Sequence, residues 1–456
     1  MSKPLREAPV TTLGLVDLMS GKMPARMAWE AEQVGPIFRW PMAGGPDAGF
    51  EVVFLVGAEA NKMVFNTHRD VFSHDKGWTP IIGDLMGQGL LNQDNPAWAR
   101  SRKMWNPAFT TAYMERYIPL IQRIVAQHTA SWAERGQVDV FQEARAITFH
   151  VAAGALAGIE RSDDVERLQR LFYALIPRTL FGNDEAAYEE YYRGALAAKE
   201  ELDAILLELI AARRATREDQ THDVLGMIVH ARDDQGRPLT DEEVLGHLYI
   251  LLVAGHETTT TLAAWTLYLL ATEPQQRARV EAELNAQLQL AGSGSLASAS
   301  ASAPLTVEAA RNLHRLDLFI REAGRLHSPV QNVPRGVLQD VEFAGYTIPA
   351  GAQVRVSLAG CHRMSRYFAD PDRFDPDRFA PPREEDRKAP YSLVTFGGGP
   401  RLCIGVNFAN IEVKAIATDV LRRYELTPAT SELPFEVGFI TEVMPGGMPM
   451  KVTSRQ

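Results

Sequence analysis

Hydrophobic residues recur every three or four positions over most of residues 95–290, as expected for helices that bury one face. The spacing is clearest over 117–125 and 202–209. Shorter helical patterns cover 58–66, 307–327 and 404–423. Because these segments make up most of the chain, the pattern predicts a mainly α fold.

A smaller β-rich region accompanies the helices. Two short strands are predicted over Phe38–Trp40 and Glu51–Val56, around a Gly/Pro-rich turn at 44–46. A second β-rich stretch is predicted over Val341–Leu358. Residues 369–390, rich in Pro, Asp and Arg, are expected to form a loop between that stretch and the last helix.

The longest predicted helix carries clear signals at both ends. Thr240 is a suitable N-cap, Glu243 three positions later completes a capping box, and Glu273-Pro274 marks the end. Its apolar stretch, Leu248–Ala271, is long enough to span a bilayer. However, Gly255-His256-Glu257 and several threonines interrupt it, and these are costly in lipid. A helix buried inside a large protein is therefore predicted, and no membrane anchor is expected.

Residues 291–304 are almost entirely Ala, Ser and Gly, which is typical of a flexible surface loop. An insertion without a function of its own explains this segment. It is not expected to divide the chain, because the motifs before and after it must share one site. A single domain over residues 1–456 is therefore predicted.

The composition excludes several classes of protein. Hydrophobic residues make up 46% of the chain and the formal net charge is −10, which suits a soluble globular protein and disfavours nucleic-acid binding. The N-terminus lacks an apolar signal segment, and two cysteines cannot form a disulfide framework. A cytoplasmic monomer is expected.

One of the two cysteines, Cys403, follows three consecutive glycines and precedes a helical pattern. Free cysteines are usually small buried core residues. Here, the glycines at 397–399 allow the backbone to approach a flat cofactor, and the N-terminus of the next helix would stabilise a thiolate. A cysteine thiolate is a known axial ligand of haem iron, and Arg401 is suited to pair with a haem propionate.

This segment resembles the signature loop of the cytochrome P-450 superfamily, the haem-thiolate monooxygenases. Phe396, Gly399, Arg401, Cys403 and Gly405 occupy the fixed positions of its pattern Phe-x-x-Gly-x-Arg-x-Cys-x-Gly. The resemblance implies haem b with Cys403 as the axial iron ligand. It also implies that Phe396, Arg401 and Gly405 contact the cofactor, Phe396 packing near the sulfur. The implied fold is a single large helical prism around a buried haem.

A second motif lies inside the long helix, where Ala254 and Thr258 share one face. A hydroxyl bonded to the carbonyl four residues earlier would bend the helix and make room for water. A packing seam of small residues would explain the segment equally well. The segment resembles the oxygen-activation motif of the same superfamily, which implies Ala254 beside the haem and Glu257 and Thr258 organising proton delivery. His256 is expected to be a surface or packing residue rather than an iron ligand.

A third motif is Glu322-Ala-Gly-Arg325, in which the two charged residues lie on one helical face. By itself this is an ordinary surface pair. Together with Pro376-Asp-Arg378-Phe379, however, it resembles the superfamily's Glu-x-x-Arg motif and the loop arginine that joins it. The resemblance implies a buried network of Glu322, Arg325 and Arg378 that supports the cysteine loop and takes no part in catalysis.

Further residues suit the carboxylates of a haem. Trp98 and Arg102 share a helical face, and an indole N–H and a guanidinium are good donors to a carboxylate. Their place in the chain matches the third helix of the superfamily, and Arg335 matches another propionate-binding arginine of bacterial members. A solvated arginine preceding a strand would explain Arg335 equally well.

The resemblance implies a monooxygenase that inserts one oxygen atom from O2 into a C–H bond of a hydrophobic molecule such as a fatty acid, terpenoid or steroid. Electrons are expected from NAD(P)H through a separate ferredoxin or flavodoxin and its reductase. Arg100, Arg102 and Lys103 form a basic cluster whose helix is predicted to help dock that acidic partner. Substrate contacts are expected from 76–92, 171–196, 248–258, 329–333 and 438–441.

Two alternative functions use the same cofactor. A peroxygenase or fatty-acid decarboxylase would run on hydrogen peroxide, but such members typically lack an acid–alcohol pair like Glu257 and Thr258. A non-enzymatic haem sensor would need neither a proton relay nor a redox partner.

Overall fold

The structure is a computed structural model that describes residues 2–14, 17, 20–41, 51–176, 185–221, 223–290, 305–433, 436–437 and 441–455. The turn predicted at 44–46, the loop predicted at 291–304 and the expected contact residues 438–440 lie outside this range.

Helices make up most of the described chain, as predicted. They are α2 (Met23–Val34), α3 (Ala58–Lys62), α4 (Asp75–Met86), α5 (Ala97–Trp105), α6 (Thr111–Thr129), α7 (Trp132–Arg135), α8 (Val140–Ala157), α9 (Ser162–Ala174), α10 (Glu185–Ala215), α11 (Val224–His230), α12 (Asp241–Thr272), α13 (Pro274–Leu290), α14 (Val307–Asn312), α15 (His314–Leu326), α16 (Leu358–His362), α17 (Glu385–Lys388) and α18 (Val406–Arg423). The helix predicted over 307–327 is divided at Leu313, which ends α14 and precedes α15.

The strands of the described residues form four small sheets. The largest has the order β2 (Ile37–Pro41), β3 (Glu51–Val56), β9 (Gln353–Ser357), β6 (Asn332–Val337), β4 (Phe72–Ser73). The others are β1 (Lys3–Pro4) with β8 (Tyr346–Ile348) and β7 (Val341–Phe343), β10 (Tyr424–Pro428) with β13 (Pro449–Ser454) and β5 (Gln137–Asp139), and β11 (Glu436–Val437) with β12 (Glu442–Val443).

The largest sheet brings the two ends of the sequence together. Strand β3 pairs in parallel with β9, with Val53 opposite Val354, and β9 pairs with β6 so that Arg335 lies opposite that same Val354. Strand β6 was not predicted, because its sequence Asn-Val-Pro-Arg-Gly-Val contains Pro and Gly, which weaken a strand pattern. Arg335 therefore lies within a strand, not before one.

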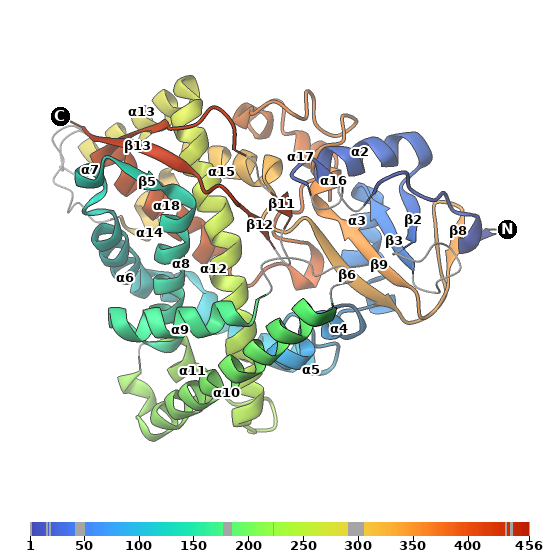
Figure 1. The fold of residues 1–456 in the computed structure, drawn as a ribbon, viewed down its shortest axis with the longest axis horizontal. Coiled ribbons are helices and arrows are strands. Elements are labelled where there is room, and N and C mark those ends of the chain that lie inside the picture. Colours follow the sequence, from blue (N-terminus) through green and yellow to red (C-terminus); the bar gives the residue numbers. More distant parts are fainter. Residues whose placement is uncertain are drawn as a thin grey trace.

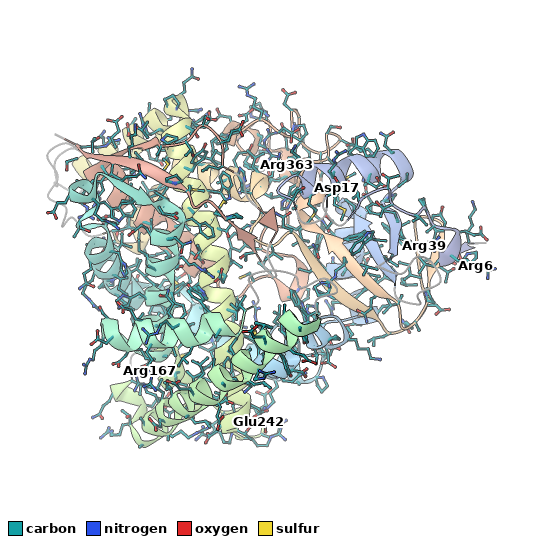
Figure 2. All side chains as sticks on the ribbon, in the orientation of Figure 1. Arg6, Asp17, Arg39, Arg167, Glu242 and Arg363 are labelled. Carbon is teal, nitrogen blue, oxygen red and sulfur yellow. The ribbon has the colours of Figure 1, made fainter. Side chains whose placement is uncertain are left out.

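Helix α12 runs through the helical part of the molecule, while β2, β3, β6 and β9 lie toward the N-terminal end (Figure 1). Both predicted ends of this helix are confirmed. The Thr240 side chain accepts from the backbone of Glu243 and the capping box is complete, while Pro274 opens α13 directly after Glu273. Most of the helix is buried, as predicted. Exposed charged residues such as Arg6, Arg167 and Glu242 lie at the periphery (Figure 2).

Candidate active site

The cysteine loop is held in place by its own backbone. The N–H of Cys403 donates to the carbonyl of Phe396 at 3.0 Å, and the N–H of Gly397 donates to Val394 at 2.8 Å. Gly397 and Gly399 have φ angles of 75° and 64°, in the left-handed region that favours glycine. The short 3-10 turn Gly399–Arg401 then leads to Cys403 and α18.

Gly399 is also required by its neighbours. A Cβ atom at this position would lie 2.0 Å from the carbonyl oxygen of Phe65, far inside contact distance. The cysteine loop therefore rests directly on the backbone that follows α3.

The two cysteines differ in their surroundings. Cys361 is fully buried and its Sγ donates to the carbonyl of Ser392 at 3.4 Å. Cys403 lines an internal cavity and is accessible through it. Burial raises the pKa of the Cys403 thiol, while the backbone N–H of Gly405 and the charge of Arg102 act in the opposite direction. Of the two, only Cys403 can present a sulfur to a ligand in this cavity.

The cavity lies between the cysteine loop and α12 and is mostly apolar. Its walls include Ala254 and Thr258 of α12 and Phe396 and Gly405 of the loop region. Residues from the segments expected to contact a substrate also line it, namely Trp78, Leu91, Leu251, Pro329, Val330 and Val333. No described residue of 171–196 is among the lining residues.

A group of cationic side chains occupies one side of this cavity. Arg335 and Arg401 both line it, and the guanidinium of Arg401 lies 4.3 Å from the ring centre of Trp98. Arg335 is only 4% exposed, and its Nε has no hydrogen-bond partner among the described residues. Burial and the charge of Arg401 lower the pKa of Arg335 to about 9.

Two neighbouring arginines also have lowered pKa values. Burial, together with the charge of Arg102, lowers the pKa of Arg401 to about 10, although Asp94 acts in the opposite direction. Burial also lowers the pKa of Arg102, whose Nε donates to Asn106 at 2.8 Å. Partly and fully buried cations with few anions around them would suit a ligand with two carboxylates, such as a haem with its two propionates.

Thr258 makes the bond to the helix backbone that was predicted. Its Oγ1 donates to the carbonyl of Ala254 at 2.8 Å, and both residues line the cavity. The hydroxyl is therefore held at the helix surface that faces the cysteine loop.

Glu257 points elsewhere in this structure. Its carboxylate accepts from Nη2 of Arg145 at 2.6 Å, is 3.1 Å from Nε2 of His256, and accepts from the hydroxyl of Thr441 at 3.5 Å. Burial alone would raise the pKa of Glu257, but His256 and Arg145 outweigh it and lower the pKa to about 2. Glu257 is 6% exposed and is not among the cavity-lining residues. Its predicted part in proton delivery stays a prediction that requires the carboxylate to leave Arg145.

His256 is a packing residue in the structure. It is fully buried, and its ring lies edge-on to Phe149 at 5.0 Å and to Phe172 at 5.7 Å. Tyr173 of α9 contacts the same ring and also stacks on Arg145, whose guanidinium lies 3.9 Å from the Tyr173 ring centre.

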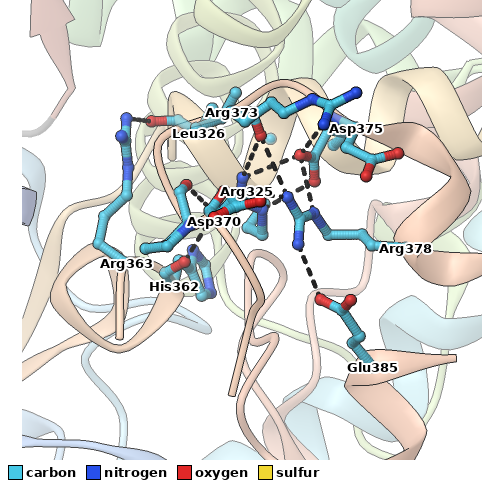
Figure 3. A network of polar contacts seen from close by, with 12 residues as sticks. Arg325, Leu326, His362, Arg363, Asp370, Arg373, Asp375, Arg378 and Glu385 are labelled. Carbon is cyan, nitrogen blue, oxygen red and sulfur yellow. Dashed lines mark hydrogen bonds and ion pairs between the residues drawn. The ribbon is translucent and has the colours of Figure 1, made fainter. Parts of the chain in front are cut away.

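Glu322, Arg325 and Arg378 meet in a fully buried network, and Figure 3 labels its two arginines. Arg325 donates to both carboxylate oxygens of Glu322, at 2.7 and 2.8 Å. Arg378 donates to Oε1 of Glu322 at 3.0 Å and to Glu385 at 2.7 Å. The network joins α15 to the loop before the cysteine segment, and its members lie outside the cavity wall.

The predicted basic cluster on α5 is mostly neutralised within the molecule. Arg100 pairs with Asp233 at 2.8 Å and Glu243 at 2.7 Å, and Lys103 pairs with Asp234 at 2.5 Å. The docking hypothesis loses much of its electrostatic basis, because these ion pairs neutralise the cluster. The acidic partners lie far along the chain and could not be assigned from the sequence.

Several site residues were not predicted. His74 lines the cavity beside the arginines, Asp94 anchors the chain near Arg401, and Arg145 holds Glu257. The sequence around each is unremarkable in composition, and their roles depend on contacts with segments far apart in the chain. Arg145 can be assigned to the site only once α8 is known to pack against α12.

The chain is similar to known proteins along most of its length. The sequence matches the family described as "Cytochrome P450" over residues 4–446. The chain belongs to the cytochrome P450 family. It is 30% identical over 394 residues to "Putative cytochrome P450 136" of Mycobacterium tuberculosis, covering 85% of this chain and 76% of that protein. It is 31% identical over 406 residues to "Putative cytochrome P450 120" of Synechocystis, covering 87% and 84%.

Solved P450 structures share the fold. The structure described as "Retinoic acid bound cyanobacterial CYP120A1" superposes with a TM-score of 0.79 at 28% identity, covering 93% of each chain. The "cytochrome P450DA heme domain" gives a TM-score of 0.85 at 24% identity, covering 100% of this chain and 99% of that one, and supports the fold alone.

Membership of the P450 family implies a haem with a cysteine thiolate ligand and monooxygenase chemistry with O2. When bound, this cofactor supplies the oxidising power that protein side chains lack. None of the helices in the described part of the chain combines the length and the apolar character needed to cross a bilayer.

Proposed function

We propose that this P450 hydroxylates a hydrophobic molecule bound between α12 and the haem, with Cys403 as the axial ligand. The observation that carries the proposal is the placement of Cys403 and the Ala254–Thr258 face of α12 on the same cavity. Trp98, Arg102, Arg335 and Arg401 would hold the propionates. Phe396 and Gly405 would pack against the thiolate side.

Thr258 would hold a water or a proton near the cavity, because its hydroxyl already bonds to the Ala254 carbonyl and faces inward. Glu257 would exchange protons with solvent after turning from Arg145, which is itself partly exposed at 21%. The charge-assisted bonds to Arg145 make this turn costly, so proton delivery is expected to depend on Arg145.

The first test is spectroscopic. The reduced, carbon-monoxide-bound protein should show the thiolate-type spectrum, and Cys403→Ser should abolish it, whereas Cys361→Ser should leave it intact. Absence of that spectrum in folded, haem-loaded protein would contradict thiolate ligation.

The second test separates a monooxygenase from its alternatives. With ferredoxin or flavodoxin, a reductase, NAD(P)H and 18O2, the product should carry one labelled oxygen atom. Product formed only with hydrogen peroxide would indicate a peroxygenase instead. A haem sensor would give no product under either condition.

The substrate class is the finer part of the proposal. The apolar wall favours a fatty acid, terpenoid or steroid. One relative, 28% identical over 415 residues and covering 89% of this chain, is named "Sterol 14alpha-demethylase" of Mycolicibacterium vanbaalenii. A spin-state titration of the ferric protein with matched members of the three classes would identify the class by the tightest saturable shift.

Electron transfer from a separate ferredoxin or flavodoxin is also proposed. The hypothesis that α5 docks this partner is tested by the double variant Lys103→Asp with Asp234→Lys. It exchanges the charges of the two positions but preserves their ion pair. If α5 docks the partner, this double variant should lower the electron-transfer rate and its salt dependence. An unchanged rate would move the docking site elsewhere.

A further inference from the structure

His74 lies immediately before α4, and its side chain lines the cavity on the side of the cationic group. Its backbone N–H donates to Oδ1 of Asp94 at 2.8 Å. Its ring Nδ1 lies 3.1 Å from the carbonyl oxygen of Leu91. These two contacts fix where the ring sits.

The Leu91 contact also fixes the hydrogen on the ring. A carbonyl oxygen only accepts hydrogen bonds, so Nδ1 must carry a proton. In the neutral ring, Nε2 is then a bare acceptor. Only the protonated ring can donate from Nε2 while keeping its bond to Leu91.

The charges around His74 come from three other segments. Arg335 reaches it from β6, Arg401 from the turn before Cys403, and Asp94 from the segment before α5. Asp94 also accepts from the Ser73 hydroxyl and faces Arg401 at 3.9 Å. Burial, then the charges of Arg335 and Arg401, hold the pKa of His74 well below its ordinary value. Burial and the two guanidinium charges thus favour the neutral ring over the protonated one.

A haem would reverse this balance, because its propionates bring negative charge to the arginines that disfavour the protonated ring. A neutral His74 would present the Nε2 lone pair to a carboxylate, and two acceptors repel. Protonation removes the repulsion and adds a charge-assisted hydrogen bond.

We propose that His74 is an additional propionate-binding residue and that it takes up one proton from solvent when haem binds. This rests on the proposed function only in requiring that the cavity hold haem. The step forms one N–H bond at Nε2, leaves the Nδ1–H bond to Leu91 in place, and transfers no electrons. Haem binding then changes the net charge of the site by the negative charges of the propionates and the one positive charge of this proton.

The proposal predicts the direction in which haem affinity changes with pH. Proton uptake at His74 should weaken haem binding as pH rises, by about tenfold per pH unit between the pKa values of the free and bound states. Loss of the Cys403 proton on ligation has the opposite effect. The two are separated by comparison with His74→Gln, because glutamine can donate to Leu91 but does not titrate.

The experiment measures protons taken up on haem binding to the full-length apoprotein, by calorimetry at pH 7 in buffers of different ionisation enthalpy. Wild type should take up about one proton more than His74→Gln. His128→Gln, at a histidine outside the cavity, should match wild type. With haem dimethyl ester, which lacks the propionate charges, wild type and His74→Gln should release equal numbers of protons.

Equal proton uptake by wild type and His74→Gln with ordinary haem would overturn the proposal. So would a difference between them that persists with the dimethyl ester. The carbon-monoxide spectrum recorded on the same samples keeps the two conclusions apart. A thiolate-type spectrum without the proton difference would reject the role of His74 alone, whereas a missing thiolate spectrum would reject the proposed function.

Discussion

At the scale of single residues, the shape of the cysteine loop depends on two glycines with different requirements. Gly397 and Gly399 both have positive φ angles, but a Cβ at 397 would meet nothing within 4 Å, whereas at 399 it would meet the Phe65 carbonyl. Substitutions at the two positions therefore distinguish the cost of a left-handed backbone from the cost of a steric collision.

Replacing each glycine by alanine tests this distinction. Gly397→Ala should lower the free energy of unfolding by about 1–2 kcal/mol, the cost of left-handed backbone for an L-residue. Gly399→Ala should cost more and should also weaken haem retention, because the loop must move away from Phe65. Urea unfolding and the rate of haem transfer to apomyoglobin measure the two effects. Equal losses in both variants would contradict the collision.

Thr258 gives a second prediction at this scale. Thr258→Ala should divert electrons from product to hydrogen peroxide while leaving substrate affinity within about twofold, since only the inward hydroxyl is removed. Thr266→Ala is the matched control, because Thr266 makes the same bond to the carbonyl four residues earlier, at 2.6 Å, but does not line the cavity. The ratio of product to NAD(P)H consumed is the measurement. A similar loss in both variants would indicate a helix effect instead.

At the scale of elements, α18 carries a buried acid with an unusual environment. Glu412 is fully buried and neither of its carboxylate oxygens has a hydrogen-bond partner among the described residues. Burial raises the pKa of Glu412 well above its ordinary value. The folded protein therefore keeps this proton at pH values where the unfolded chain has lost it.

The sign of the resulting pH dependence follows. Above about pH 4.5 the folded state binds more protons than the unfolded state, so the free energy of unfolding falls as pH rises, by up to about 1.4 kcal/mol per unit. Glu412→Gln removes this term and should stabilise the protein more at pH 8 than at pH 5. Urea unfolding at the two pH values measures the difference. An equal change at both would mean that Glu412 is ionised in the folded protein.

At the scale of the whole molecule, the buried charge network ties distant segments together. Glu322 of α15 binds Arg378 of the loop before the cysteine segment, and Arg378 continues to Glu385 of α17. Because the three side chains of the predicted network are fully buried, removing Arg378 deprives the buried Glu322 of one of its two cationic partners.

Arg378→Met should therefore cost about 3–5 kcal/mol in the free energy of unfolding. Arg387→Met provides the control in the same part of the chain, because its pair with Glu384 is exposed, with the Arg387 side chain 76% accessible. That variant should change the free energy by less than about 1 kcal/mol. Chemical denaturation of both variants decides the matter, and comparable losses would show that the network contributes little.

The sequence predicted those features that depend on residues close together in the chain. The capping box at Thr240, the end of α12 at Pro274 and the bond from Thr258 to Ala254 each involve residues at most four apart, so their pattern is visible in one short segment. The same holds for the cysteine loop, whose pattern lies within residues 396–405.

What the sequence could not predict depends on packing between distant segments. Arg145 reaches Glu257 across the contact between α8 and α12, and Asp233, Asp234 and Glu243 neutralise α5. Strand β6 was missed because pairing with β9 outweighs its Pro and Gly, and this brings Arg335 into the buried interior. In each case, the partner is specified by the fold rather than by any nearby residue.

The contact between Gly399 and Phe65 also joins two segments that are made at different times during synthesis. Phe65 precedes Cys403 in the sequence, so the backbone on which the loop rests leaves the ribosome before the sulfur does. A nascent chain that ends before Cys403 would already contain Arg102 and Arg335 but would lack the proposed iron ligand. If Cys403 holds the iron as proposed, stable capture of the cofactor waits until this residue has been made, and chains truncated before it would not sequester haem.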